Sequence, residues 1–231
     1  MWILLVAAFA VWGVAMSMRA GRRLALPALP LLAASVFVLR MLLAVANVSF
    51  GPLPGIDVDA VALLEHSERV VAQVLEGGSP YPWTHRYSYA NVLAPFALVA
   101  SGDALALLIA AFHALLWTAV LCHMAWIGRH LGLTAGPLYA VMLIAALHPP
   151  SLLYSAGALR EAPLILCLAV YARAILSAEP GTEVGSWRAW AATAAGIYLH
   201  PGLLALVPLT LAMPLFRGGR RGRFGMGMRV A

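Results

Sequence analysis

Charged residues are scarce in this chain of 231 residues, at 10% of the sequence against roughly 25% in soluble domains. Hydrophobic residues make up 63% of it. A water-soluble fold of this size leaves much of its surface exposed and has no means of hiding so many apolar side chains. The composition therefore excludes a soluble domain and predicts that lipid surrounds most of the chain.

The apolar runs also lack the alternation of apolar and polar residues that membrane barrel strands show. Backbone groups in lipid must be hydrogen-bonded within the protein, which leaves helices or a closed barrel as spanning structures. Long runs rich in Ala and Leu favour helices. We therefore expect an all-α integral membrane protein, with a single transmembrane domain over residues 1–231.

Sequence motifs of several enzyme classes are absent. There is no phosphate-binding loop, no G-x-G-x-x-G and no C-x-x-C, and the 7 histidines lack metal-ligand spacing. The 2 cysteines, Cys122 and Cys167, lie in apolar runs, where we expect them to pack rather than to form a disulfide. Lysine is absent too, and the 15 basic residues are arginines scattered at the ends of apolar runs, so we expect no nucleic-acid partner.

About seven membrane spans are expected, because a crossing helix needs about 20 apolar residues. The apolar runs are residues 2–18, an extra N-terminal span, then 27–46, 104–127, 131–147, 163–177 and 187–216. Proline removes a helix hydrogen bond, so we expect His200-Pro201-Gly202 to divide the last run into two short spans. Residues 90–100 are too short to cross and are expected to lie at the interface or to re-enter.

The arginine distribution supports this topology. With the N-terminus outside, the cytoplasmic arginines are 19, 22, 23, 129, 173, 188, 217, 220, 221, 223 and 229, and the outer ones are 40, 69, 86 and 160. An excess of arginine in cytoplasmic segments is the general rule for membrane proteins. We therefore expect a basic cytoplasmic tail at 217–231 and a large outer loop at 47–103.

The outer loop contains one amphipathic segment. Over residues 59–76 its apolar side chains share one helical face and its charged side chains the other, which predicts a helix in the membrane interface. Asp57 and Asp59 stand at its start. One of them is a candidate helix cap, and either is a candidate general base for an acceptor hydroxyl.

A second acidic motif, Arg160-Glu161, comes at the outer end of the fifth span. Glu161 in a first helical turn would stabilise the helix dipole, and an ionisable residue at membrane depth is equally a functional candidate. The triplet Asp57-Val58-Asp59 is similar to the metal-binding acid pair of soluble nucleotide-sugar transferases, although those enzymes need an α/β domain. No cofactor follows from the sequence beyond a divalent cation that such a pair allows.

The order of these features resembles a known family. The elements are Gly77-Gly78-Ser79-Pro80-Tyr81-Pro82, Arg129-His130-Leu131-Gly132, His148-Pro149-Pro150-Ser151-Leu152-Leu153-Tyr154-Ser155, Leu159-Arg160-Glu161-Ala162 and Gly196-Ile197-Tyr198-Leu199-His200-Pro201-Gly202. Over residues 27–216 the chain resembles the N-terminal half of the GT-C superfamily of membrane glycosyltransferases, which includes protein O-mannosyltransferases and aminoarabinose transferases. Members are longer and often carry further spans and a C-terminal domain.

The resemblance implies a polyprenyl-phosphate-linked sugar as donor and an acid of the first outer loop as base. That acid matches Asp57 or Asp59, and we favour Asp57 because it lies closer to the span. Glu161 matches the second acidic motif, and His200 stands where the family often has arginine before proline. The outward-facing cations that can hold a phosphate are Arg40, Arg86 and Arg160.

Two functions from different classes remain open. The first is a glycosyltransferase, or a truncated relative, acting at the outer face of the bacterial inner membrane. The second is a non-catalytic polytopic subunit that supports a protein partner, which the short length of the chain favours. A transporter is less favoured, because acids deep within the expected spans are lacking.

Overall fold

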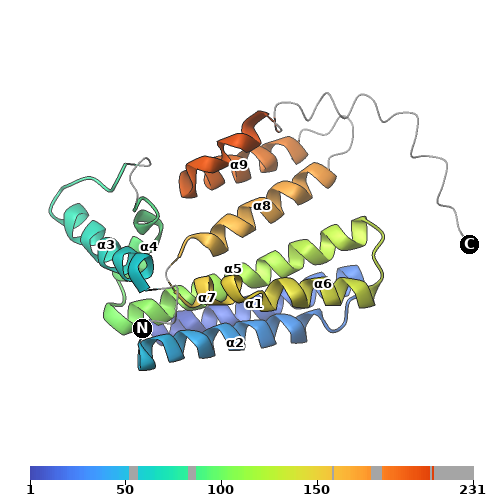
Figure 1. The fold of residues 1–231 in the computed structure, drawn as a ribbon, viewed down its shortest axis with the longest axis horizontal. Helices are drawn as coiled ribbons and strands as arrows, with labels where there is room; N and C mark the ends of the chain where they lie inside the picture. The colour runs from blue at the N-terminus through green and yellow to red at the C-terminus, as the bar shows by residue number, and fades with distance from the viewer. Residues whose placement is uncertain (52–56, 83–86, 158, 178–183, 209, 211–231) are drawn as a thin grey trace, which may run out of the picture.

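The computed structural model describes residues 1–51, 57–82, 87–157, 159–177, 184–208 and 210 (Figure 1). Every regular element among these residues is helical. The elements are α1 (Trp2–Leu24), α2 (Leu29–Phe50), α3 (Asp57–Leu75), α4 (Ala90–Ala97), α5 (Gly102–His130), α6 (Ala135–Leu147), α7 (Pro149–Ala156), α8 (Glu161–Leu176), α9 (Val184–Leu199) and a short 3₁₀ helix (Pro201–Ala205). The expectation of an all-α protein is therefore confirmed for the described residues.

Three helices are long and apolar enough to cross a membrane, namely α1, α2 and α5. Together α6 and α7 qualify as one broken span, with a bend of 52° between them. The chain thus has the helices of a membrane protein. The helices α8 and α9 have 16 residues each. At a rise of about 1.5 Å per residue they are shorter than a hydrocarbon core of about 30 Å.

The central helix is α5, which packs against α1, α2 and α8 (Figure 1). Its buried residues lie on several faces, among them Leu108, Ile109 and Leu121, each with no exposed surface. Small residues allow helices to approach closely in membrane proteins. At Gly128 a Cβ atom would lie only 2.4 Å from Leu138 Cδ1, so α6 packs closely on this turn of α5 and a larger residue would displace the end of the Leu138 side chain.

The bend between α6 and α7 follows from two prolines. Pro149 and Pro150 have no N–H, so the carbonyl groups four residues earlier, at Ala145 and Ala146, lose their helical donors. The Ser151 hydroxyl lies 3.1 Å from Ala145 O and 2.9 Å from His148 O, so its single proton is shared between these two carbonyl groups. A side chain from α2 reaches Ala146 O. The bend is therefore stabilised by side chains that replace the missing backbone donors.

The side chain that reaches the bend is Arg40, which has no exposed surface. Its guanidinium group donates to Ala146 O at 3.1 Å, to Ser151 O at 2.6 Å and to the Ser155 hydroxyl. It also lies 4.3 Å from the centroid of the Trp117 ring. Arg40 thus joins α2 to both halves of the broken span and to α5.

The helices α3 and α4 cover one end of the bundle (Figure 1). The predicted amphipathic helix at 59–76 is confirmed as α3, with bounds shifted by one or two residues. Ala60, Leu63 and Val70 on its apolar face are buried in the core cluster that α4 shares. Leu75 stays 75% exposed, so α4 covers only part of the face that we expected to meet the membrane interface.

The break predicted at His200-Pro201-Gly202 occurs where expected. The helix α9 ends at Leu199, and the 3₁₀ helix begins at Pro201. The His200 Nδ1 atom accepts a hydrogen bond from Gly202 N at 3.1 Å, which caps the new turn. At Gly196 a Cβ atom would come within 2.6 Å of Leu203 Cδ1, so glycine permits the chain after the break to return along α9.

Candidate functional site

Three of the residues singled out from the sequence line one cavity of about 70 Å³. They are Asp59, Arg160 and Glu161, which come from two motifs far apart in the chain. The remaining lining residues are Leu63, Tyr87, Tyr89 and Leu159. The cavity lies where α3, the segment before α4 and the start of α8 meet, at the end of the bundle that α3 and α4 cover.

The first turn of α3 presents Asp59 to the cavity. The described part of α3 begins at Asp57, so Asp59 lies within the helix and is not its cap. The side chain of Asp57 lies outside the described residues, as does all of Arg86. The structure therefore locates Asp59 among the expected site residues, while the preference for Asp57 as the base stays a prediction.

Arg160 is the residue before the first turn of α8, and its side chain reaches the end of α9. Its Nη1 atom donates to Leu199 O at 3.3 Å, next to His200. A guanidinium group has five N–H donors, so this contact leaves most of them for another acceptor. Arg160 therefore joins α8 to α9 and still presents a cation to the cavity.

Glu161 begins α8, where a carboxylate stabilises the helix dipole as expected. Its Oε2 atom is buried and has no hydrogen-bond partner among the described residues. The group is partly buried, and the charges of Arg160 and Asp59 act on it. A buried acceptor without a partner is costly in a protein interior, which makes Glu161 a candidate contact for a hydroxyl-bearing ligand.

Sequence reasoning missed the tyrosine–histidine pair behind the cavity. Tyr89 is 1% exposed, and its hydroxyl oxygen lies 2.8 Å from His113 Nε2. The other ring nitrogen of His113 lies 3.1 Å from Gly157 O, so it carries the proton of the neutral ring and Nε2 accepts from the Tyr89 hydroxyl. Burial, and then the charge of Glu161, raise the pKa of the Tyr89 phenol above its ordinary value. Tyr89 therefore stays protonated.

A network of ring and amide contacts fixes the other wall of the cavity. Tyr87 stacks on His66 of α3 at 4.1 Å between ring centroids. The His66 Nδ1 atom lies 2.7 Å from the Tyr81 hydroxyl. Asn91 of α4 donates to Tyr81 O at 2.8 Å and to the Tyr198 hydroxyl of α9 at 3.0 Å. The segment that carries Tyr87 and Tyr89 is thus attached to three helices.

Two other expected contacts lie apart from this cavity. His200 is exposed beside Leu199 and caps the turn after α9. Arg40 is at the centre of α2 rather than near the outer end of a span, because α2 continues to Phe50. Its contacts are with the α6–α7 bend. Arg160 is therefore the one phosphate-binding candidate of the described residues that lines the cavity.

No group of three or more His, Cys, Asp or Glu side chains that could hold a metal ion occurs in the described part of the chain. Comparison with protein-family models, curated proteins and solved structures finds no match to this chain. What the chain does therefore has to be inferred from its residues and their arrangement.

Proposed function

We propose that this chain is a membrane glycosyltransferase, or a shortened relative, that transfers a sugar from a polyprenyl-phosphate donor to an acceptor hydroxyl. The observation that supports this proposal is the meeting of Asp59 with Arg160 and Glu161 in one cavity. These residues belong to the two acidic motifs on which the resemblance to GT-C enzymes rests. Such a transfer needs a base and a contact for the phosphate anion. A carboxylate and a guanidinium group with free N–H donors, in one cavity, can supply them.

The transfer itself is a substitution at the anomeric carbon of the donor sugar. The acceptor oxygen forms a bond to that carbon, and the bond from the carbon to the phosphate oxygen breaks. Asp59 takes the proton of the acceptor hydroxyl, and the phosphate leaves on its polyprenyl carrier. Arg160 stabilises the negative charge on the leaving phosphate through its free N–H donors.

Glu161 and Tyr89 orient the substrates in this scheme. The buried Oε2 of Glu161 accepts a hydrogen bond from a sugar hydroxyl, which gives that atom the partner it lacks among the described residues. Tyr89 stays neutral and is held by His113, so it contributes a fixed wall rather than a second base. The roles of base, anion contact and positioning groups thus fall to different residues of one cavity.

We further propose about seven spans in a bacterial inner membrane, with the N-terminus, α3 and α4 outside. The last turns of α1, α5 and α8 carry Arg22, Arg23, Arg129 and Arg173, which supports placing those ends in the cytoplasm. Cysteine substitutions at Gly78 and Gly219 test this topology with an impermeant thiol reagent. Labelling from opposite sides is expected, and labelling from one side contradicts it.

A non-catalytic subunit is the second candidate, and the size of the cavity favours it. Sites for small molecules usually enclose about 300–1,000 Å³. The cavity here measures about 70 Å³, which is room for the reacting groups but not for a whole sugar. Under this alternative a protein partner completes or supplies the binding site.

The substitution Asp59→Asn distinguishes the two candidates. It keeps the shape of the side chain but removes the proton acceptor, so a catalytic Asp59 predicts a loss of about 100- to 10,000-fold in transfer rate. The assay follows transfer from lipid-linked sugars in membranes that contain the chain and its native partners. Asp103→Asn, in the exposed first turn of α5, is the matched control and should keep full activity.

Parallel thermal-unfolding measurements show whether each variant folds. Equal transfer rates for Asp59→Asn and Asp103→Asn in folded protein would contradict a catalytic Asp59. In that case Asp57→Asn tests the base that the sequence favours. Full activity in both Asp59→Asn and Asp57→Asn would favour the second candidate, a non-catalytic subunit that supports a partner.

A further inference from the structure

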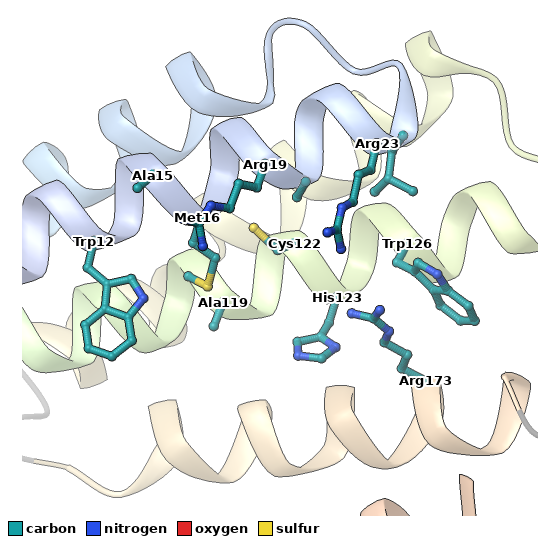
Figure 2. Close-up of a pocket in the computed structure, with 12 residues that line it drawn as sticks. Trp12, Ala15, Met16, Arg19, Arg23, Ala119, Cys122, His123, Trp126 and Arg173 are labelled. Atoms are coloured by element: carbon teal, nitrogen blue, oxygen red, sulfur yellow. The ribbon is translucent and has the colours of Figure 1, made fainter. Parts of the chain in front are cut away.

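A second cavity, of about 500 Å³, is lined by residues of α1, α5 and α8 (Figure 2). The C-terminal ends of these three helices lie away from α3 and α4 (Figure 1). Its volume falls in the usual range of ligand sites. It shares no lining residue with the cavity that contains Asp59. A ligand here would therefore be independent of the proposed transfer reaction.

Four cationic or basic side chains face this cavity from three helices. Arg19 and Arg23 stand one turn apart on α1, His123 comes from α5 and Arg173 from the last turn of α8 (Figure 2). The lining contains no acidic residue. Like charges gathered in a partly enclosed site repel one another, so an anion that lies between them lowers the energy of the whole group.

Two of these groups have features that an anionic ligand would use. The Arg173 guanidinium group lies 4.9 Å from the centroid of the Trp126 ring, and both side chains line the cavity. Stacking on an aromatic ring holds the group in place and leaves its N–H donors free at the edge. The His123 Nδ1 atom is buried and has no hydrogen-bond partner in the part of the chain that the structure describes.

The cavity is apolar at one end and basic at the other. Along α1 its lining runs from Trp12 and Met16 to Arg23 (Figure 2). Eleven residues of helix cover about 16 Å, so the cavity is much longer than one phosphate group. Trp12 is 66% exposed, which opens the apolar end to the surrounding lipid. This gradient matches a molecule with an anionic head group and a hydrocarbon chain.

We propose that this cavity binds a membrane lipid whose head group carries an anionic phosphate. The phosphate lies among Arg19, Arg23, Arg173 and His123, and the first part of the hydrocarbon chain lies along Trp12, Met16 and Ala119. Basic pockets between membrane helices are general binding sites for anionic lipid head groups. Arginine is suited to this role because its planar group makes bidentate contacts with phosphate.

Arginines at this end of the bundle also have a simpler explanation, since positive charge gathers on the cytoplasmic side of many membrane proteins. Arg22 separates the two explanations. It belongs to the same turn of α1 as Arg23 but lines a different hollow, with Met18 and Gly21. Loss of Arg22 removes the same charge from the same membrane face without changing the proposed site.

The test measures binding to the purified full chain in a neutral detergent, by native mass spectrometry and by thermal unfolding. The probes are phosphatidylglycerol, phosphatidylcholine and inorganic phosphate. Phosphatidylglycerol is expected to bind and to raise the unfolding temperature, and the other two are expected to do so weakly. Equal binding of phosphatidylcholine would contradict the proposal that the site selects an anionic head group. Equal stabilisation by inorganic phosphate would contradict the proposal that the ligand is a lipid and would indicate a simple anion site.

Variants then locate the site. Arg23→Gln and Arg173→Gln should each weaken phosphatidylglycerol binding about 10-fold or more, as expected for loss of a charge-assisted contact. Arg22→Gln should keep the affinity for phosphatidylglycerol within about 2-fold of that of the unchanged protein, because Arg22 acts on the head group only through screened electrostatic attraction from outside the cavity. Equal weakening by Arg22→Gln overturns the proposal in favour of general surface charge.

A further variant changes the apolar end alone. Ala119→Phe fills the part of the cavity proposed for the hydrocarbon chain and leaves all four basic side chains in place. It should weaken phosphatidylglycerol binding and leave any residual binding of inorganic phosphate unchanged. Undiminished lipid binding in a folded Ala119→Phe protein would contradict the proposed position of the lipid's hydrocarbon chain. Because each variant is compared by its own unfolding curve, misfolding is recognised separately.

Discussion

Arginine side chains occupy the helix bundle in two regions that differ in what accepts their hydrogen bonds. At the α6–α7 bend, the guanidinium group of Arg40 donates to the backbone oxygens of Ala146 and Ser151 and to the Ser155 hydroxyl. In the cavity between α1, α5 and α8, the lining contains Arg19, Arg23 and Arg173 but no carboxylate. The Arg40 guanidinium group donates to three oxygens of the protein, and its buried Nε atom has no partner among the described residues. The lining of the cavity offers no carboxylate to its arginines.

The difference shows when an arginine within membrane helices is structural. Pro149 and Pro150 remove two backbone donors, and Arg40 with Ser151 replaces them, so this arginine completes the fold. No such defect in a helix explains the arginines of the cavity. A cation whose acceptors are all within the protein stabilises it, whereas a group of cations without acceptors is suited to an external anion. The following predictions test this distinction, beginning with the largest expected effect.

Replacement of Arg40 should be the most damaging change. Arg40→Met keeps much of the volume but leaves buried carbonyl groups without donors, at an expected cost of about 3 kcal/mol or more in unfolding free energy. Thermal and denaturant unfolding in detergent measure the effect. Arg22→Met, at an exposed position of α1, is the control and should change stability little. A stable Arg40→Met protein would show that the bend does not need this side chain.

Replacement of Ser151 should have a smaller effect on the same bend. Ser151→Ala removes the hydroxyl that lies within hydrogen-bond distance of His148 O and of Ala145 O, and Pro149 has already deprived Ala145 O of its helical partner. The expected loss is about 1–2 kcal/mol. Ser177→Ala is the matched control, because its hydroxyl also donates to a helix carbonyl but is exposed to solvent. Similar losses of unfolding free energy in Ser151→Ala and Ser177→Ala would mean that the missing proline donors do not strengthen the contribution of the Ser151 hydroxyl.

A double-mutant cycle isolates the bond between Arg40 and Ala146 O. Pro150→Ala restores an N–H four residues after Ala146, so in the Arg40→Met protein it should recover about 1 kcal/mol of stability. In the unchanged protein the same substitution should bring no comparable gain, because Arg40 already occupies that oxygen. The same gain in both proteins would argue against this role of Arg40.

The cavity arginines should contribute least to stability. Arg23→Gln in detergent without added lipid is expected to change the unfolding free energy by less than about 0.5 kcal/mol. Its effect should emerge only when phosphatidylglycerol is present, as a smaller rise in unfolding temperature than in the unchanged protein. A large loss of stability without lipid would place Arg23 with Arg40 as a structural arginine.

The sequence predicted the elements of the fold more completely than the site. It located α3 and the breaks at His148-Pro149-Pro150 and His200-Pro201-Gly202, because amphipathic patterns and prolines act locally on the backbone. It also singled out Asp59, Arg160 and Glu161, which line one cavity in the structure, but it did not favour Asp59 over Asp57. That choice depends on where α3 begins and which way its first turn faces.

Composition predicted that lipid surrounds the chain, and the long apolar runs without alternation predicted helices, because a backbone without water has to form its hydrogen bonds within the protein. The tertiary structure decided which polar groups meet. Arg40 could be found in the sequence, but its partners in the α6–α7 bend and those of Tyr89 on α5 could not. Contacts between distant helices depend on which faces pack together, and along these nearly uniform apolar helices the sequence pattern marks those faces only weakly.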